Sequence, residues 1–397
     1  MCVRNGGKNR RQEGSDQLSR KIGAPLSSES RAASVDVPTF GVEEEFLLVD
    51  RETRVPTPCV SMVLKSAGEV LGDQVQAELF PTQVETCTRP VRTLQELRGE
   101  LLRLRTAIAA AAAETGCLAV ASGTAVVPAP GSFEVTGSSR YLRMAAEFGA
   151  VTDELGSGVC GCHVHVAVSC RDEAVRLGNH LRPWLPTVGA LAANSPFRKG
   201  WDSGYASWRA MSWSQWPGVG PPPMLPDAAA YDALVDSLIA AGFMLDRGMI
   251  YWYARPSEHF PTLEVRVADV NADLDTVVLL AALVRGLTAT LVGAVRADEP
   301  APAIPDRLLQ AAHWRAARDG LAGFGLDLAA GRPRPAVELV EALIERAAPG
   351  LEAAGDMDEV QALWRRVRLA RGGAARQREA YRRRGDLRDV VDDLTVQ

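Results

Sequence analysis

Four stretches of this chain alternate between apolar and polar residues with a period of two, which is the pattern of a β-strand. They are GVEEEFLLVD (41–50), AELFPTQVET (77–86), GCHVHVAVSC (161–170) and TLEVRVADV (262–270). CLAVASGT (117–124) is more continuously apolar and predicts a buried strand. The sequence therefore predicts a sheet whose strands are widely spaced along the chain.

Other stretches repeat at the spacing of a helix. Leu94, Leu97, Leu101, Leu104 and Ile108 recur every three or four residues, which predicts a helix over 92–115 that Gly116 ends. Further helices are predicted over 138–155, 181–193 and 274–295, and the remainder is expected to be helical after a proline-rich break at 300–305. Residues 194–226, rich in Trp, Gly, Pro and Ser, are expected to form a long functional loop. Strands with mixed connections that are followed by helices favour an α+β fold over a doubly wound sheet.

Length and charge narrow the class of protein. The chain has 397 residues, 47% of them hydrophobic, and a formal net charge of −5, so it can bury a large core and lacks the basic surplus of a nucleic-acid binder. The C-terminal arginines alternate with apolar positions and precede several aspartates, which favours a salt-bridged helix face.

Residues 1–38 are polar and predict a disordered tail without a signal-peptide core, and no stretch has the ~18 consecutive apolar residues of a membrane span. The seven cysteines are scattered and odd in number, which favours reduced thiols in a cytoplasmic protein.

The four alternating strands each place chemically capable side chains on one face, because residues i and i+2 of a strand point the same way. The pairs are Glu43 with Glu45, Gln83 with Glu85, His163 with His165, and Glu264 with Arg266. An ordinary solvent-exposed face would explain one such strand. Lysine is absent from all four, however, and carboxylates with a histidine suit a divalent cation that also holds phosphates. We therefore predict a site on this face, with Glu44 pointing the opposite way in a structural role and Gln83 a weaker ligand than Glu85.

A zinc site is the rival interpretation of CGCHVH. Cys160 and Cys162 share parity with Val164, so they are expected to face away from both histidines and to lie in the core. No GxxxxGK[ST] loop, GxGxxG turn or GxSxG elbow occurs, which argues against a P-loop, a Rossmann turn and an α/β-hydrolase.

Eight motifs occurring in order carry a family resemblance. They are GVEEEFLLVD, PTQVET, GCHVHV, ANSPF, GYASWR, WPGVGPP, RPSEHFPTLEVRVADV and GGAARQR. Together they resemble the glutamate–cysteine ligase family, in particular its YbdK-type branch of carboxylate–amine ligases, over about residues 39–393. The resemblance implies a single catalytic domain over 39–397 with a glutamine-synthetase-like fold, a curved and mostly antiparallel sheet with helices packed on its outer face.

The resemblance also implies roles for individual residues. Glu43, Glu45, Glu85, His163 and Glu264 match the metal-binding set, for Mg²⁺ or Mn²⁺, and Arg266 matches the residue that contacts the ATP phosphates. Catalysis is expected to depend on Arg266 and Glu85. Arg209, Arg255 and His165 are the candidates for substrate binding, although Arg209 could instead be a surface arginine stacked on Trp208 or Trp213.

The implied reaction is ATP-dependent amide formation through an acyl phosphate, with release of ADP and phosphate and with glutamate and cysteine as the substrates. Two alternatives stay open: the same chemistry on another acid and amine, and a weakened paralogue that only binds metal and nucleotide. Tyr253 and Gln215 stand where relatives of the resembled family often carry Asp and Arg, which predicts a changed acid or amine pocket. A homodimer would suit the family, and neither a nucleic-acid nor a membrane partner is expected.

Overall fold

The computed structural model describes residues 36–397. The predicted disordered tail, residues 1–38, therefore lies outside the described residues except for its last three, which precede the first strand without regular structure.

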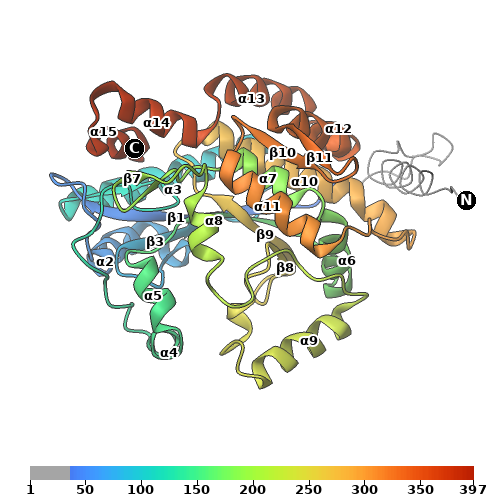
Figure 1. Ribbon diagram of the computed structural model, residues 1–397, viewed down its shortest axis with the longest axis horizontal. Helices are drawn as coiled ribbons and strands as arrows, with labels where there is room; N and C mark the ends of the chain where they lie inside the picture. Colours follow the sequence, from blue (N-terminus) through green and yellow to red (C-terminus); the bar gives the residue numbers. More distant parts are fainter. Residues whose placement is uncertain (1–35) are drawn as a thin grey trace, which may run out of the picture.

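A seven-stranded antiparallel sheet forms the centre of the protein (Figure 1). Its strands are β1 (Phe40–Asp50), β2 (Val75–Ala77), β3 (Gln83–Cys87), β4 (Cys117–Val120), β5 (Gly161–Ala167), β8 (Ala254–Pro256) and β9 (Thr262–Asp269). The order is β2-β3-β1-β5-β9-β8, and β4 also pairs with β1. Along one edge of β1, the first half pairs with β5 and the second half with β4, so the sheet forks there.

Helices make up most of the rest of the chain. They are α2 (Val60–Leu71), α3 (Leu94–Glu114), α4 (Ser139–Glu147), α5 (Gly149–Leu155), α6 (Arg171–Leu181), α7 (Leu185–Ala192), α8 (Trp208–Trp213), α9 (Ala228–Ala240), α10 (Leu274–Arg296), α11 (Asp306–Asp319), α12 (Ala336–Ala354), α13 (Met357–Ala370), α14 (Gly373–Arg384) and α15 (Leu387–Leu394). Two 3₁₀ turns, η1 (Gly72–Gln74) and η2 (Arg247–Met249), and two small hairpins, β6–β7 (Phe197–Arg198, Trp201–Asp202) and β10–β11 (Phe324–Asp327, Arg332–Pro335), complete the structure.

The main core lies between one face of the sheet and a layer of helices. Val164, Leu263 and Val265 point from the sheet into this core and meet the apolar sides of α6, α7 and α10. Figure 1 shows α10, α12 and α13 on this side, while α4, α5 and α9 lie on the other. The opposite face of the same strands carries the polar residues, so the period-2 pattern of the sequence decides which face is covered.

Helix α10 is apolar on all sides because other elements surround it. Among the described residues it is the one helix that is long and apolar enough to cross a membrane, yet 89% of the qualifying window is buried inside the protein. It packs against α12, α13 and α6, so its composition is explained by a central position in the core.

Local signals explain where α3 begins. The hydroxyl of Thr93 accepts a hydrogen bond from the Glu96 backbone N–H, and the Glu96 carboxylate accepts one from the Thr93 N–H, at 3.1 and 3.0 Å. This capping box satisfies two N–H groups that a helix start leaves open.

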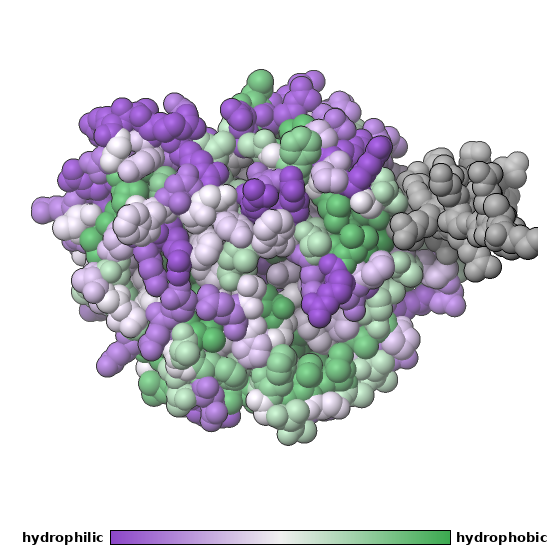
Figure 2. Space-filling model, viewed as in Figure 1, coloured by the Kyte–Doolittle hydropathy of each residue, from purple (hydrophilic) through white to green (hydrophobic). Residues whose placement is uncertain are grey.

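The C-terminal arginines behave as predicted: Arg384 pairs with Asp389, and Arg388 with Asp386. Figure 2 shows hydrophilic residues dense over α14 and α15.

Several predicted elements differ from the structure. The helix predicted over 138–155 is two helices that break at Phe148, and the helix predicted over 181–193 begins at Leu185 after a separate helix, α6. The predicted loop 194–226 contains the β6–β7 hairpin and also α8, which Ser207 caps by accepting from the Ala210 N–H. The β10–β11 hairpin interrupts a region that was expected to be helical.

Candidate active site

The candidate site lies on the polar face of four neighbouring strands. Strand register places Glu43 opposite His163, Glu45 opposite Glu85, and His165 opposite Glu264. These side chains line a cavity of about 550 Å³ that opens between the sheet and the segments on its polar side. Residues more than 200 positions apart in the sequence are thus brought together by strand pairing.

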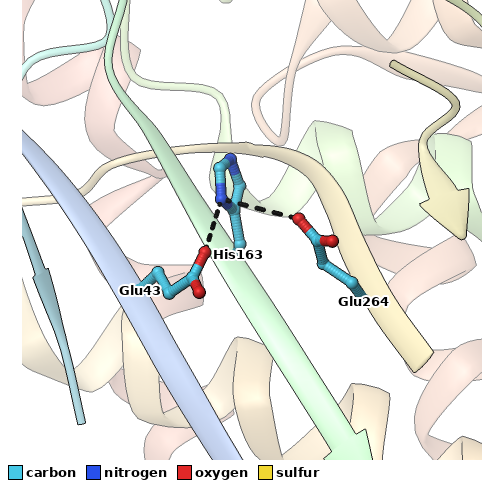
Figure 3. A group of neighbouring side chains, drawn as sticks. All are labelled: Glu43, His163 and Glu264. Carbon is cyan, nitrogen blue, oxygen red and sulfur yellow. Dashed lines mark hydrogen bonds and ion pairs between the residues drawn. The ribbon is translucent and has the colours of Figure 1, made fainter. Parts of the chain in front are cut away.

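His163 is the centre of this group. Its Nδ1 lies 3.1 Å from Glu43 Oε2 and 3.9 Å from Glu264 Oε1, and its Nε2 lies 3.7 Å from Glu45 Oε1. Figure 3 shows Glu43, His163 and Glu264 converging from β1, β5 and β9. Two groups of side chains could each hold a metal ion: Glu43, His163 and Glu264 form one, and Glu45, Glu85 and His163 form the other. Within each group, the ligand atoms lie within 4.8 Å of one another.

A β-bulge positions Arg266 beside this group. The register between β5 and β9 shifts between Cys162 and Val164, so that two residues of β9, Arg266 and Val267, lie opposite His163. Bulges of this kind re-aim a side chain. The Arg266 guanidinium donates to the carboxylate of Glu264, which also accepts from Arg255 Nε at 2.8 Å.

The electrostatics divide the carboxylates into two kinds. Although burial opposes it, the cations Arg255 and Arg266 hold the pKa of Glu264 well below its usual range, so Glu264 is ionised. Burial, together with repulsion from Glu78 and other neighbouring carboxylates, raises the pKa of Glu85 well above its usual value. Burial also raises the pKa of Glu45 and of Glu78. Around Glu45, Glu78 and Glu85, burial and neighbouring carboxylates therefore oppose the ionisation of all three groups at once.

The pKa values of the two histidines are shifted in opposite directions. Burial, and then the charge of Arg266, lowers the pKa of His163 to about 4, so its imidazole is neutral near pH 7 and can offer a lone pair to a metal. His165 Nδ1 lies 2.9 Å from the Thr262 hydroxyl, and its Nε2 lies 3.2 Å from Glu43 Oε1. Burial lowers the pKa of His165, but contact with Glu43 outweighs burial, so the pKa of His165 is raised.

Comparison with known proteins identifies the family. Residues 39–393 match the profile of glutamate–cysteine ligase family 2. The chain belongs to this family. A "Putative glutamate--cysteine ligase 2-1" of Saccharopolyspora erythraea is 47% identical over 361 residues, which cover 90% of this chain and 94% of that protein. A "Putative glutamate--cysteine ligase 2" of Salinispora tropica is 47% identical over 364 residues, covering 91% of this chain and 96% of that protein. The resemblance predicted from the motifs is confirmed, and the chain is a member of a carbon–nitrogen ligase family.

Solved structures confirm the fold. The glutamate–cysteine ligase of Francisella tularensis in complex with AMP has a TM-score of 0.65 at 14% identity, over 90% of this chain and 87% of that chain. A bifunctional glutathione synthetase of Pasteurella multocida has a TM-score of 0.67 at 13% identity, over 91% of this chain and 52% of that chain. The predicted α+β fold, with an antiparallel sheet and helices on its outer face, is the fold of this glutamate–cysteine ligase family 2 member.

Every residue predicted for the metal set lies in this cavity, as do Arg266, Arg255 and His165. Arg209 does not: it lines a neighbouring cavity, with its Nη1 3.8 Å from Asp269 Oδ1. It is buried, so the alternative of a surface arginine stacked on tryptophan is wrong, and Arg198 occupies the face of Trp208 instead.

The structure also places four other residues that the sequence analysis singled out: Glu44, Cys160, Cys162 and Gln83. Glu44 is buried and paired with Arg105, as its parity predicts. Cys162 lies in the apolar core with Val164, as its parity predicts, and Cys160, which precedes β5, is buried in a second apolar cluster. The Gln83 amide donates to the Val159 carbonyl at 2.8 Å, so it anchors a neighbouring segment.

Sequence reasoning missed Glu78, which lines the same cavity beside Glu85. The segment 78–82 leaves the sheet between β2 and β3, so counting parity along AELFPTQVET fails there. Gln76 of β2 lies opposite Glu85 and donates to it at 2.6 Å, and Glu78 follows directly after this strand, so its position depends on the pairing of β2 with β3.

Proposed function

We propose that this protein is an ATP-dependent carboxylate–amine ligase that activates glutamate, or a related acid, as an acyl phosphate and joins it to cysteine or another amine. The observation that carries the proposal is the set of carboxylates and histidines on four adjacent strands, with Arg266 among them. The names of the family and of its relatives support the acid and amine classes. The AMP bound to the Francisella tularensis protein supports a nucleotide substrate.

The side chains fit a divalent cation. Nε2 of His163 is buried without a hydrogen-bond partner among the described residues, and several buried carboxylates lie close enough to repel one another. Hard oxygen donors with one imidazole suit Mg²⁺ or Mn²⁺. Glu43, His163 and Glu264 would hold one ion, and Glu45 and Glu85 another. When bound, such ions neutralise charge on the phosphates and orient them.

The cationic residues serve different parts of the reaction. Arg266 points into the cavity from the β9 bulge and would take up charge on the transferred phosphate, since a buried guanidinium binds phosphate oxygens with two parallel N–H groups. Arg255 keeps Glu264 ionised and oriented. Arg209 would hold a substrate carboxylate outside the acidic cavity, and His165 would contact the substrate or nucleotide at the rim.

The proposed reaction forms and breaks bonds only in ATP, the acid and the amine, so no side chain has to act as a nucleophile. One carboxylate oxygen of the acid attacks the γ-phosphorus of ATP, and ADP leaves. The amine nitrogen then attacks the acyl carbon, the C–O bond to phosphate breaks, and the amine gives up one proton. The original carboxylate oxygen departs in the phosphate. The chain contributes by positioning and by electrostatic stabilisation.

Phosphate release from ATP with Mg²⁺ tests the proposal. Release that requires both glutamate and an amine is expected, and a panel of acids and amines identifies the preferred pair. Nucleotide binding without release for any pair would overturn the ligase proposal and leave the binding paralogue.

Two variants test the assigned roles. Glu85→Gln is expected to lower turnover by about 100-fold or more, because it removes a ligand for the cation that stabilises the phosphates. Full activity of Glu85→Gln would show that the metal assignment is wrong. Arg266→Ala is expected to raise the KM for ATP and lower kcat, with partial recovery in Arg266→Lys, and an unchanged KM and kcat would contradict its role.

A further inference from the structure

The motif GGAARQR, residues 372–378, has no part in the site described so far, because none of its residues lines the acidic cavity. Its central residue, Gln377 of α14, is fully buried. The Gln377 amide donates to the Asn194 carbonyl at 2.7 Å and to Asn194 Oδ1 at 2.8 Å. Gly373 allows this approach, because a Cβ atom there would lie 2.2 Å from Asn194 Oδ1. The motif therefore fixes the chain at Asn194.

Asn194 connects the motif to Asp269. The Asn194 N–H donates to Asp269 Oδ2 at 2.8 Å, and its side-chain amide donates to the carbonyls of Ala121 and Val270. Asp269 is the last residue of β9, three residues after Arg266, and it is 1% exposed. Asn194 therefore links α14 to the end of the strand that carries Arg266.

Two serines continue the contact from Asp269 to the start of α8. The Ser195 hydroxyl donates to Asp269 Oδ2 at 2.7 Å and accepts from the Arg209 N–H at 3.0 Å. The Ser207 hydroxyl donates to Asp269 Oδ1 at 2.9 Å and accepts from the Ala210 N–H at 3.1 Å. Each hydroxyl gives its proton to the carboxylate and its lone pair to the first turn of the helix. Asp269 therefore fixes the backbone from which the Arg209 side chain projects.

The Arg209 side chain projects to the edge of the acidic cavity. A Cβ atom at Gly161 would lie 2.3 Å from Arg209 Nη2 and 3.0 Å from His163 Nε2. The Gly161 N–H donates to Glu45 Oε2 at 2.5 Å. The guanidinium thus approaches the strand backbone beside two residues of the proposed metal set. Burial raises the pKa of Glu45, and of the groups that lower this pKa, Arg209 has the largest effect.

We propose that Asp269 is a positioning residue that holds Arg209 in place for the ligase reaction. Asp269 lines neither the acidic cavity nor the cavity beside it. Its Oδ1 lies 3.8 Å from Arg209 Nη1, so it acts through the start of α8 more than by direct contact. Gln377 supports Asp269 through Asn194, which gives the GGAARQR motif a part in the reaction. This inference rests on the proposed function, in which Arg209 holds a substrate carboxylate.

A double-mutant cycle is the first test. Phosphate release is measured with Mg²⁺, ATP and the acid and amine pair that gives the fastest release. Asp269→Asn is expected to lower kcat/KM about 100-fold, because an error of about 1 Å in a positioned group can cost this much. In an Arg209→Ala background the same change is expected to cost less than about twofold, since Asp269 then has no guanidinium to position. Equal losses in both backgrounds would overturn the inference while leaving the ligase proposal intact.

Two milder variants keep the cycle informative if Asp269→Asn does not fold. Ser195→Ala removes only the hydroxyl between Asp269 and the Arg209 N–H, and Gln377→Leu removes the donors to Asn194. Each is expected to lower kcat/KM about tenfold in the wild type and less than about twofold in the Arg209→Ala background. Additive losses for both variants would contradict a positioning role.

Asp356→Asn is the matched control. Asp356 is also a buried aspartate beside an arginine, and it accepts a hydrogen bond from Arg285 in the helical layer. Asp356→Asn is expected to lower the Tm and to leave kcat/KM of the folded protein within about twofold. A loss of kcat/KM as large as that in Asp269→Asn would show that destabilisation alone explains both variants, which would overturn the inference.

A binding measurement separates this inference from the proposed function. L-Glutamate and L-cysteine are titrated by calorimetry in the presence of Mg²⁺ and a non-hydrolysable ATP analogue. The Kd of the substrate that Arg209→Ala weakens is expected to rise about tenfold in Gln377→Leu, and to rise less than about twofold when Gln377→Leu is added to Arg209→Ala. This result supports the positioning role even if no amine gives turnover, in which case only the ligase proposal fails. Kd values that Arg209→Ala and Gln377→Leu leave unchanged for both substrates would overturn the inference.

Discussion

Glu44 and Glu45 are neighbours in sequence with opposite surroundings. Glu44 points into the core and accepts from Arg105 Nε at 2.9 Å, while a second nitrogen of Arg105 binds its other oxygen. Glu45 points into the acidic cavity, where burial raises its pKa. Alternation along β1 therefore separates a stabilising carboxylate from a functional one.

Substitution of these two residues is expected to have opposite effects. Glu44→Gln leaves Arg105 buried without its counter-ion and is expected to lower the free energy of unfolding by about 3–5 kcal/mol. Glu45→Gln removes a charge from a repulsive cluster, so metal-free stability is expected to be retained or increased while phosphate release falls by about 100-fold or more. Urea unfolding and the phosphate assay measure both quantities. Equal destabilisation by the two variants would contradict the separation of roles.

His313 should make stability depend on pH. Burial, and then the charge of Arg182, lowers the pKa of His313 from 6.5 to about 3. Between these values the unfolded chain binds a proton that the folded protein does not, so stability falls as the pH falls below 6.5. From pH 6.5 to pH 5 the loss is about 2 kcal/mol at ~1.4 kcal/mol per pH unit.

Urea unfolding at pH 5 and pH 7 measures this effect. The wild type is expected to lose about 2 kcal/mol more than His313→Gln between the two pH values, because the variant has no imidazole to protonate. The same pH dependence in both proteins would exclude His313 as the origin.

At the scale of elements, α10 and α12 approach each other through glycine. A Cβ atom at Gly350 would lie 2.0 Å from the carbonyl oxygen of Gly286, and the Gly350 N–H donates to the Thr290 hydroxyl at 2.9 Å. The two helix backbones are therefore in contact, and a side chain at this position would force them apart.

Gly350→Ala is expected to lower the free energy of unfolding by about 2–3 kcal/mol, because it overpacks this crossing. Gly68→Ala is the matched control: Gly68 lies in α2, and a Cβ atom there would have no neighbour within 4 Å, so alanine is expected to stabilise by about 0.5–1 kcal/mol. Urea unfolding of both variants measures the difference. A neutral Gly350→Ala would show that α10 and α12 can separate without cost.

For the whole molecule, a bound cation would connect four strands that carry repelling carboxylates. A ligand that binds only the folded state stabilises it by mass action, by about 2.7 kcal/mol at a concentration of 100 Kd. Mg²⁺ or Mn²⁺ with a nucleotide is therefore expected to raise the Tm by several degrees.

Thermal unfolding with and without Mg²⁺ and a non-hydrolysable ATP analogue measures this shift. The shift should be lost in Glu85→Gln and kept in Glu69→Gln, which changes an exposed glutamate of α2. An equal shift in both variants would place the cation elsewhere.

The sequence alone determined the faces of the four strands, because the period of two is a local property of an extended chain. It therefore predicted which glutamates and histidines share a surface, and the motifs predicted the family. It could not determine Glu78, where the chain leaves the sheet, or the bulge at Arg266, because both depend on the pairing of strands distant in sequence. Only the tertiary structure decided that Arg209 is buried beside a neighbouring cavity, since that cavity is formed by α8, α11 and β9 together.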